Sequence, residues 1–128
     1  MSIRTPLARA RGLGSAKSGT RHWWLQRVTA LALIPLAVWF IVGVVVLGAA
    51  DHAAAVAWIG HPVSAVLLIL AIGFGFWHGQ LGLQVVIEDY VHGEGCRIAL
   101  MLAMKGAALL LAVAGILSVL RVALGGAV

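Results

Sequence analysis

The sequence has few charged residues for its length. Of its 128 residues, 10% are charged and 62% are hydrophobic, and the mean hydropathy is +1.07. A soluble domain of this size needs a more polar surface than this composition supplies. The low charge therefore excludes a soluble globular fold and predicts an integral membrane protein that forms one domain over residues 1–128.

Cysteine and acidic residues are also scarce. The single cysteine, Cys96, has no second thiol in the chain with which to form a disulfide. One thiol offers no metal site by itself, so we interpret Cys96 as a small apolar filler. There are four acidic residues, and none of them precedes Asp51.

The basic residues are concentrated near the N-terminus. Six of the nine precede the first long apolar run: Arg4, Arg9, Arg11, Lys17, Arg21 and Arg27. An acid-free basic arm before a membrane helix is a signal of cytoplasmic orientation, and it explains the charge without nucleic acid as a partner. Residues 51–61 contain no Lys or Arg and are expected on the opposite side. We treat residues 1–22 as a cytoplasmic arm of the mature protein rather than a transit peptide.

Three apolar runs are long enough to cross a bilayer, which takes about 20 residues. They predict an all-α fold with three transmembrane helices over residues 23–50, 62–90 and 97–122. Pro35 lies inside the first run and is expected to kink that helix.

Polar segments separate the three runs. A turn region is expected between the first two helices, marked by Asp51-His52 and Gly60-His61-Pro62, and a polar loop at residues 88–95 is expected before the third.

The second predicted helix carries the residues of greatest chemical interest. Gly75, His78, Gly79 and Gly82 fall on one face at about 100° per residue. The glycines either allow close contact with another helix or leave room for a flat group beside His78. An ionisable residue inside a membrane span suggests function. His78 is either a neutral histidine bonded to a neighbouring helix or a haem ligand whose second axial partner comes from another subunit.

Further polar residues lie at the predicted cytoplasmic boundary. Asp89 follows His78 by eleven residues, which places it on the same face about 16 Å along the axis. With Tyr90 it forms either an ordinary polar helix end or a site where a quinone takes protons from water. Arg27 either snorkels to the interface or pairs with an anionic cofactor group. Lys105, about two turns inside the third helix, is assigned no role.

Two motifs resemble a known family. The first comprises RTPL at residues 4–7, GLGSAK at 12–17 and HWWLQRVTA at 22–30, and the second is HGQLGLQVVIEDYV at 78–91. Both resemble the hydrophobic membrane-anchor subunit of succinate dehydrogenase of the alphaproteobacterial type. The second motif is the more specific, because its histidine, its glycines and its terminal Asp-Tyr match the second helix of that family. The third predicted helix is similar only in length and hydrophobicity.

The resemblance implies a non-catalytic anchor subunit of respiratory complex II in the bacterial inner membrane, with no succinate or flavin site of its own. It implies three kinds of partner: a second hydrophobic anchor (the cytochrome b subunit), an iron–sulfur subunit and a flavoprotein subunit. The cofactors implied are haem b and ubiquinone. Carried over to this sequence, His78 is an axial ligand of the haem iron and Arg27 pairs with a haem propionate. Asp89 and Tyr90 belong to the quinone site.

The sequence leaves two alternatives. The same architecture serves a quinol:fumarate reductase, which runs the reaction in reverse with menaquinone. A structural or transport subunit with a packed glycine stripe and no cofactor would have the same hydropathy. A visible spectrum of the purified complex distinguishes the cofactor-free subunit from the redox anchors, because only the redox anchors contain a reducible b-type haem.

Overall fold

The computed structural model describes residues 5–10 and 19–125. Within these residues the chain forms five helices and no strand: α1 (Pro6–Ala10), α2 (Gly19–Leu47), α3 (His52–Gly60), α4 (Pro62–Tyr90) and α5 (Glu94–Ala123). Three of them, α2, α4 and α5, are long and apolar enough to cross a membrane. The predicted all-α fold with three spans is confirmed. Much of the predicted basic arm, including Arg4, Arg11 and Lys17, lies outside the described residues.

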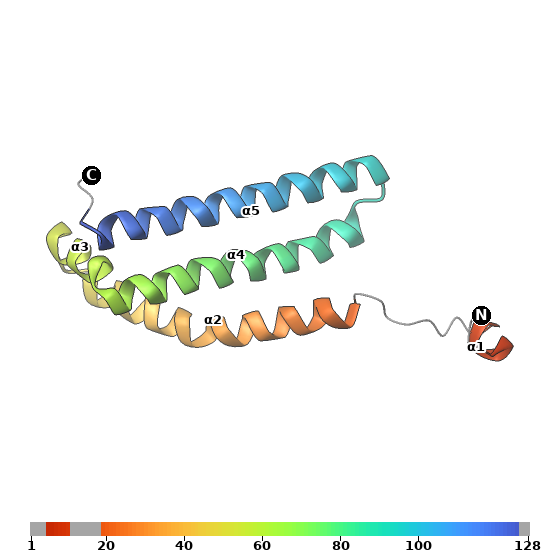
Figure 1. Cartoon of the computed structure of the whole chain (residues 1–128), viewed down its shortest axis with the longest axis horizontal. Coiled ribbons are helices and arrows are strands. Elements are labelled where there is room, and N and C mark those ends of the chain that lie inside the picture. Colours follow the sequence, from red (N-terminus) through yellow and green to blue (C-terminus); the bar gives the residue numbers. More distant parts are fainter. Residues whose placement is uncertain (1–4, 11–18, 126–128) are drawn as a thin grey trace.

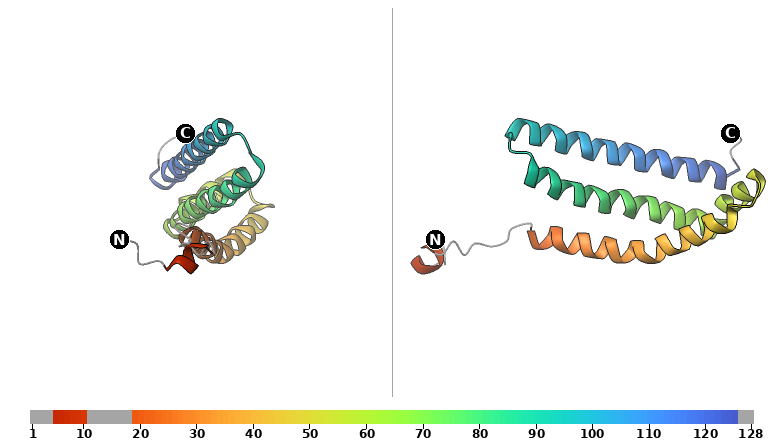
Figure 2. Two further views of the ribbon diagram at one scale, coloured as in Figure 1. Left: turned by 90° about the vertical axis from the view of Figure 1, so that its right-hand side faces the viewer. Right: turned by 180° about the vertical axis from the view of Figure 1, so that it is seen from behind.

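The three long helices lie side by side, with α4 between α2 and α5 (Figure 1). Two further views show the same order (Figure 2). The start of α2, the end of α4 and the start of α5 share one end of the array. At the other end, α3 packs against both α4 and α5. Antiparallel packing therefore places the first turns of α2 beside the second half of α4, and this pairing builds the candidate site.

The first span differs slightly from its predicted bounds. α2 begins at residue 19 rather than 23 and ends at residue 47 rather than 50. It bends in the half that follows Pro35 (Figures 1 and 2). A proline inside a helix removes one backbone donor and its ring crowds the preceding turn, so a bend at this place is expected.

The segment between the first two spans is a helix rather than the expected turn region. Asp51 caps α3, and its carboxylate accepts a hydrogen bond of 2.8 Å from the backbone N–H of Ala54. Pro62 opens α4, where a missing N–H does no harm. The turn markers are therefore boundaries of helices. The alanine-rich residues between them fold because alanine has the highest helix propensity.

The last two spans enclose a shorter loop than predicted. α4 has the predicted bounds, but α5 begins at Glu94 rather than at residue 97. An acidic side chain in a first helical turn is stabilised by the exposed N–H groups there. The polar loop expected at residues 88–95 is reduced to residues 91–93. Cys96 therefore lies in α5 and is exposed, so its interpretation as an apolar filler is wrong.

A small apolar core holds the helices together at the α3 end. Ala65, Leu68 and Val119 form its buried centre between α4 and α5. Close packing continues where the side chain of Ile72 covers Gly115: a Cβ at position 115 would lie 3.3 Å from Ile72. Glycine thus permits the close approach of α5 to α4.

Trp58 ties α3 to α2. Its ring stacks on Trp39 with centroids 5.1 Å apart and planes 18° from parallel. The ring also occupies the space above Gly43, where an added Cβ would lie 2.5 Å from Trp58. Any side chain at position 43 would have to displace the indole, so the glycine is required for this packing.

Most of the remaining apolar surface is uncovered by the chain itself. In the most apolar 18-residue stretches of α2, α4 and α5, only 6%, 11% and 6% of the residues, respectively, are buried within the structure. Leu31, Val45 and Leu110 are each at least 70% exposed. Such surface is stable against lipid or against the apolar face of another subunit.

Candidate functional site

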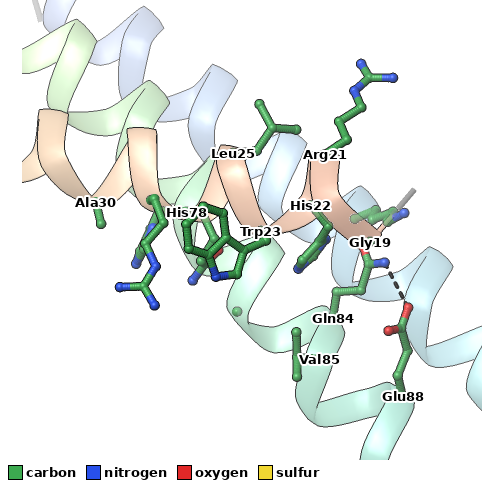
Figure 3. Close-up of a pocket in the computed structure, with 14 residues that line it drawn as sticks. Gly19, Arg21, His22, Trp23, Leu25, Ala30, His78, Gln84, Val85 and Glu88 are labelled. Atoms are coloured by element: carbon green, nitrogen blue, oxygen red, sulfur yellow. Dashed lines mark hydrogen bonds between the residues drawn. The ribbon is translucent and has the colours of Figure 1, made fainter. Parts of the chain in front are cut away.

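A cavity of about 1010 Å³ lies where the first half of α2 faces the second half of α4. Figure 3 shows that one wall comes from α2 and the facing wall from α4. The residues that line it include His22, Gln26, Arg27, His78, Gly82, Gln84, Glu88 and Lys105. The structure therefore brings together two of the predicted site residues, Arg27 and His78, from distant parts of the sequence.

His78 is held from the facing helix by Thr29. Nδ1 of His78 lies 3.0 Å from Oγ1 of Thr29. The same hydroxyl oxygen lies 2.7 Å from the carbonyl oxygen of Leu25 and 3.2 Å from that of Gln26. Thr29 is only 1% exposed, so water does not compete for these bonds. The ring is anchored through Nδ1, which leaves Nε2 available to a group outside the chain.

This contact satisfies both interpretations of His78. A hydrogen bond to a neighbouring helix is present, as expected of a structural histidine. It engages a single ring nitrogen, and a histidine that ligates a metal usually engages its other nitrogen in the same way. The contact of this partly buried ring therefore fits a histidine that ligates a metal as well as a structural histidine.

The glycines of α4 divide into two groups. Gly82 faces α2, where Nε2 of Gln26 lies 3.5 Å from the position of an added Cβ. For Gly75 and Gly79, no atom of the described residues outside their own turns lies within 4 Å of that position. This pair makes no close helix contact within the described chain. The bare backbone beside His78 has room for a flat group or for a helix of another subunit.

The cavity lining carries cationic groups. The Arg27 guanidinium lies over the ring of Trp23, with its carbon 5.2 Å from the centroid, which favours one position of this long side chain. Lys105 reaches the same cavity from α5. Glu88 is present too, and its carboxylate accepts a hydrogen bond of 2.8 Å from Gln84 (Figure 3). Because the Glu88 carboxylate is already hydrogen-bonded to Gln84, the positive charges of Arg27 and Lys105 can attract an anionic group on a bound molecule.

Two buried polar atoms at the cavity have no hydrogen-bond partner among the described residues. They are Nε2 of His22 and Oε1 of Gln26. Buried polar atoms are nearly always paired, so these two indicate a partner outside the described residues. Sequence reasoning missed both residues, and Thr29 with them. The signal was the spacing of His22, Gln26 and Thr29 by four and then three residues, which places these polar side chains on one face of α2.

Asp89 and Tyr90 lie outside the cavity. They are the last two residues of α4, and neither is among the residues that line the cavity. Both are exposed, Tyr90 to 78%. They follow Glu88 directly, at the end of the helix array where α2 begins. The structure therefore separates the predicted haem residues from the predicted quinone residues.

His78, Arg27 and the open glycines of α4 have the chemistry that a haem between this chain and another subunit would need. Within the described part of the chain, no three His, Cys, Asp or Glu side chains converge on a metal site. A haem iron, however, needs only one side chain at each axial position. At the cavity, Nε2 of His78 would supply an axial ligand and Arg27 a partner for a carboxylate. The open backbone at Gly75 and Gly79, which lies on the same helix but outside the cavity lining, would leave space for a flat ring.

Comparisons with known proteins agree on one family. Residues 1–123 match the family described as succinate dehydrogenase/fumarate reductase transmembrane subunit. The chain is 34% identical over 117 residues to the succinate dehydrogenase hydrophobic membrane anchor subunit of Rickettsia bellii, covering 91% of this chain and 94% of that protein. The protein of the same description from Paracoccus denitrificans is 33% identical over 97 residues, which cover 76% and 75% of the two chains.

A third relative is described as the succinate dehydrogenase membrane anchor subunit of Reclinomonas americana. It is 33% identical over 85 residues, which cover 64% of this chain and 71% of the relative. These similarities confirm the resemblance indicated by the motifs at residues 4–30 and 78–91. The family match also extends through α5, further than the motifs alone indicated.

Proposed function

This chain belongs to the family of succinate dehydrogenase and fumarate reductase transmembrane subunits, and we propose that it couples succinate oxidation to quinone reduction in a bacterial inner membrane. It is a multi-pass membrane anchor subunit and assembles with the other subunits of the complex. We assign it no succinate or flavin site of its own. The relatives are described as succinate dehydrogenase subunits, which supports this direction over fumarate reduction.

His78 is proposed as an axial ligand of a b-type haem. The observation that carries this proposal is its position: an imidazole within an apolar span that lines a cavity, is bonded to Thr29 through Nδ1 and has no partner for Nε2 among the described residues. The second axial ligand would come from the partner anchor. Arg27 is proposed to pair with a propionate, which its place in the same cavity supports. When bound, the haem supplies one-electron redox chemistry.

Asp89 and Tyr90 are proposed to form part of the ubiquinone site. Quinone reduction consumes protons, and the exposed end of α4 gives access to water beside an apolar phase. The phenol of Tyr90 would donate a hydrogen bond to a quinone carbonyl. Asp89 would orient neighbouring basic groups or relay protons. The iron–sulfur and flavoprotein subunits would dock at this same end.

The experiment that tests this function is a reduced-minus-oxidised visible spectrum of the purified complex. We expect the bands of a b-type haem that succinate reduces. A complex that contains all its subunits and shows no haem band would favour the cofactor-free anchor and contradict the proposal.

The proposed orientation places the N-terminus and residues 91–93 in the cytoplasm and α3 outside. Cysteine labelling with a membrane-impermeant maleimide checks it. Ala53→Cys, made in a Cys96→Ser background, should react in cells with a permeabilised outer membrane and not in everted vesicles, because Ala53 lies on the exposed surface of α3. The parent Cys96, exposed at the other end, serves as the opposite control. Labelling of Ala53→Cys from the cytoplasmic side alone would reverse the topology.

A further inference from the structure

We infer that Thr29 is a positioning residue that fixes the tautomer of His78, so that the proton lies on Nδ1 and Nε2 presents a lone pair. This inference rests on the proposed function, in which Nε2 binds the haem iron. It goes beyond that function by assigning a role to a residue that touches neither haem nor quinone.

The assignment follows from counting protons on one oxygen. The Thr29 hydroxyl has a single hydrogen and two lone pairs. Its oxygen lies 2.7 Å from the carbonyl oxygen of Leu25 and 3.0 Å from Nδ1 of His78. A carbonyl can only accept, so the shorter contact requires the hydroxyl to donate to Leu25. The hydrogen is then used, and the contact with His78 requires Nδ1–H to donate to the hydroxyl.

The opposite arrangement is disfavoured. If Thr29 donated its hydrogen to Nδ1, its oxygen would face the Leu25 carbonyl oxygen at 2.7 Å with no proton between them. The carbonyl oxygen of Gln26, at 3.2 Å, would be a second acceptor facing the same lone pairs. Because Thr29 is 1% exposed, no solvent relieves this repulsion. Buried contacts of this kind are expensive since the local dielectric is low.

The consequence for ligation is direct. A neutral imidazole binds iron through its unprotonated nitrogen, so the Nδ1–H tautomer is the one in which Nε2 can act as ligand. A hydroxyl that already donates to a carbonyl is also a stronger acceptor. Donation from Nδ1–H to such an oxygen raises the basicity of Nε2 and stabilises the oxidised iron. Thr29 thus both selects the ligating nitrogen and lowers the haem potential.

The test is a set of variants of Thr29 in the intact complex, measured by haem content and by redox titration of the haem. Thr29→Ser keeps the hydroxyl and should match the parent. Thr29→Ala differs from Thr29→Ser by one oxygen, and Thr29→Val has nearly the shape of threonine without its hydroxyl. Complexes with either of these two variants should bind haem about 10- to 100-fold more weakly than the parent complex. The midpoint potential of the haem that stays bound should move to a more positive value in both.

Ser118→Ala is the matched control. Ser118 donates to the carbonyl of Ala114 over 2.8 Å, the same backbone contact four residues back, but among the described residues it makes no hydrogen bond to a histidine. This variant should leave haem content and potential unchanged. If Thr29→Val fails to assemble, Thr29→Ala still decides the question, because it adds no atoms to the interface.

Two results would overturn the role of Thr29: a parental haem potential in Thr29→Ala and Thr29→Val, or a Thr29→Ser variant as defective as Thr29→Ala. The second result would show that packing of the methyl group, not the hydroxyl, matters. The proposed function itself would fail on different results: a parent complex that contains no haem, or a His78→Ala complex that retains its haem. In that case Thr29 has no axial ligand to position and the inference falls with the function.

Discussion

His78→Ala is expected to lose the b-type haem while the complex still assembles. A methyl group cannot coordinate iron. Loss of an outer-shell partner alone typically weakens metal binding about 10- to 100-fold, so loss of the ligand itself should exceed this. Assembly is expected because the small core at Ala65, Leu68 and Val119 is formed elsewhere. The Thr29 hydroxyl also keeps its bond to the carbonyl of Leu25.

Haem content per complex, from the pyridine haemochrome and the visible spectrum, measures this effect. His61→Ala is the matched control, because His61 is exposed between α3 and α4, at the other end of the array. That variant should keep full haem content. A His78→Ala complex with the parent's spectrum and haem content would remove His78 from the site and leave it as a structural histidine.

Tyr90→Phe is expected to lose quinone reduction selectively. The change removes one hydroxyl from a side chain that is 78% exposed, so folding should be unaffected. Haem content and electron transfer from succinate to an artificial acceptor should match the parent, because both depend on sites elsewhere in the complex. Succinate:quinone reductase activity should fall about 100-fold if the phenol acts in proton transfer.

Both activities are measured on the same membranes, so that differences in expression cancel. Trp24→Phe is the control for an aromatic belt: Trp24 lies near the start of α2, at the same end of the array, and is 57% exposed. If Tyr90 is only an interfacial anchor, the two variants should both have parental quinone reductase activity. That outcome would contradict the assignment of Tyr90 to the quinone site.

Hydropathy and charge were sufficient for the fold class and for the bounds of α4. The run from residue 62 to residue 87 has no charged side chain, begins with a proline and ends at the only adjacent pair of acids, so length and polarity mark both of its ends. They were less informative for α3. Its residues are as apolar as a membrane span but too few to cross a bilayer, and the flanking Asp51 and Pro62 were interpreted as turn markers.

The sequence by itself determined that this protein crosses a membrane three times, and its motifs indicated the family and drew attention to His78. These properties depend on composition and on neighbours within one helix, which a sequence displays directly. Only the tertiary structure decided that Thr29, 49 residues away, meets Nδ1 of that histidine, and that Gly82 faces α2 while Gly75 and Gly79 stay open. The angle and register at which α2 packs on α4 set these contacts, and such packing is fixed by side chains from both helices together.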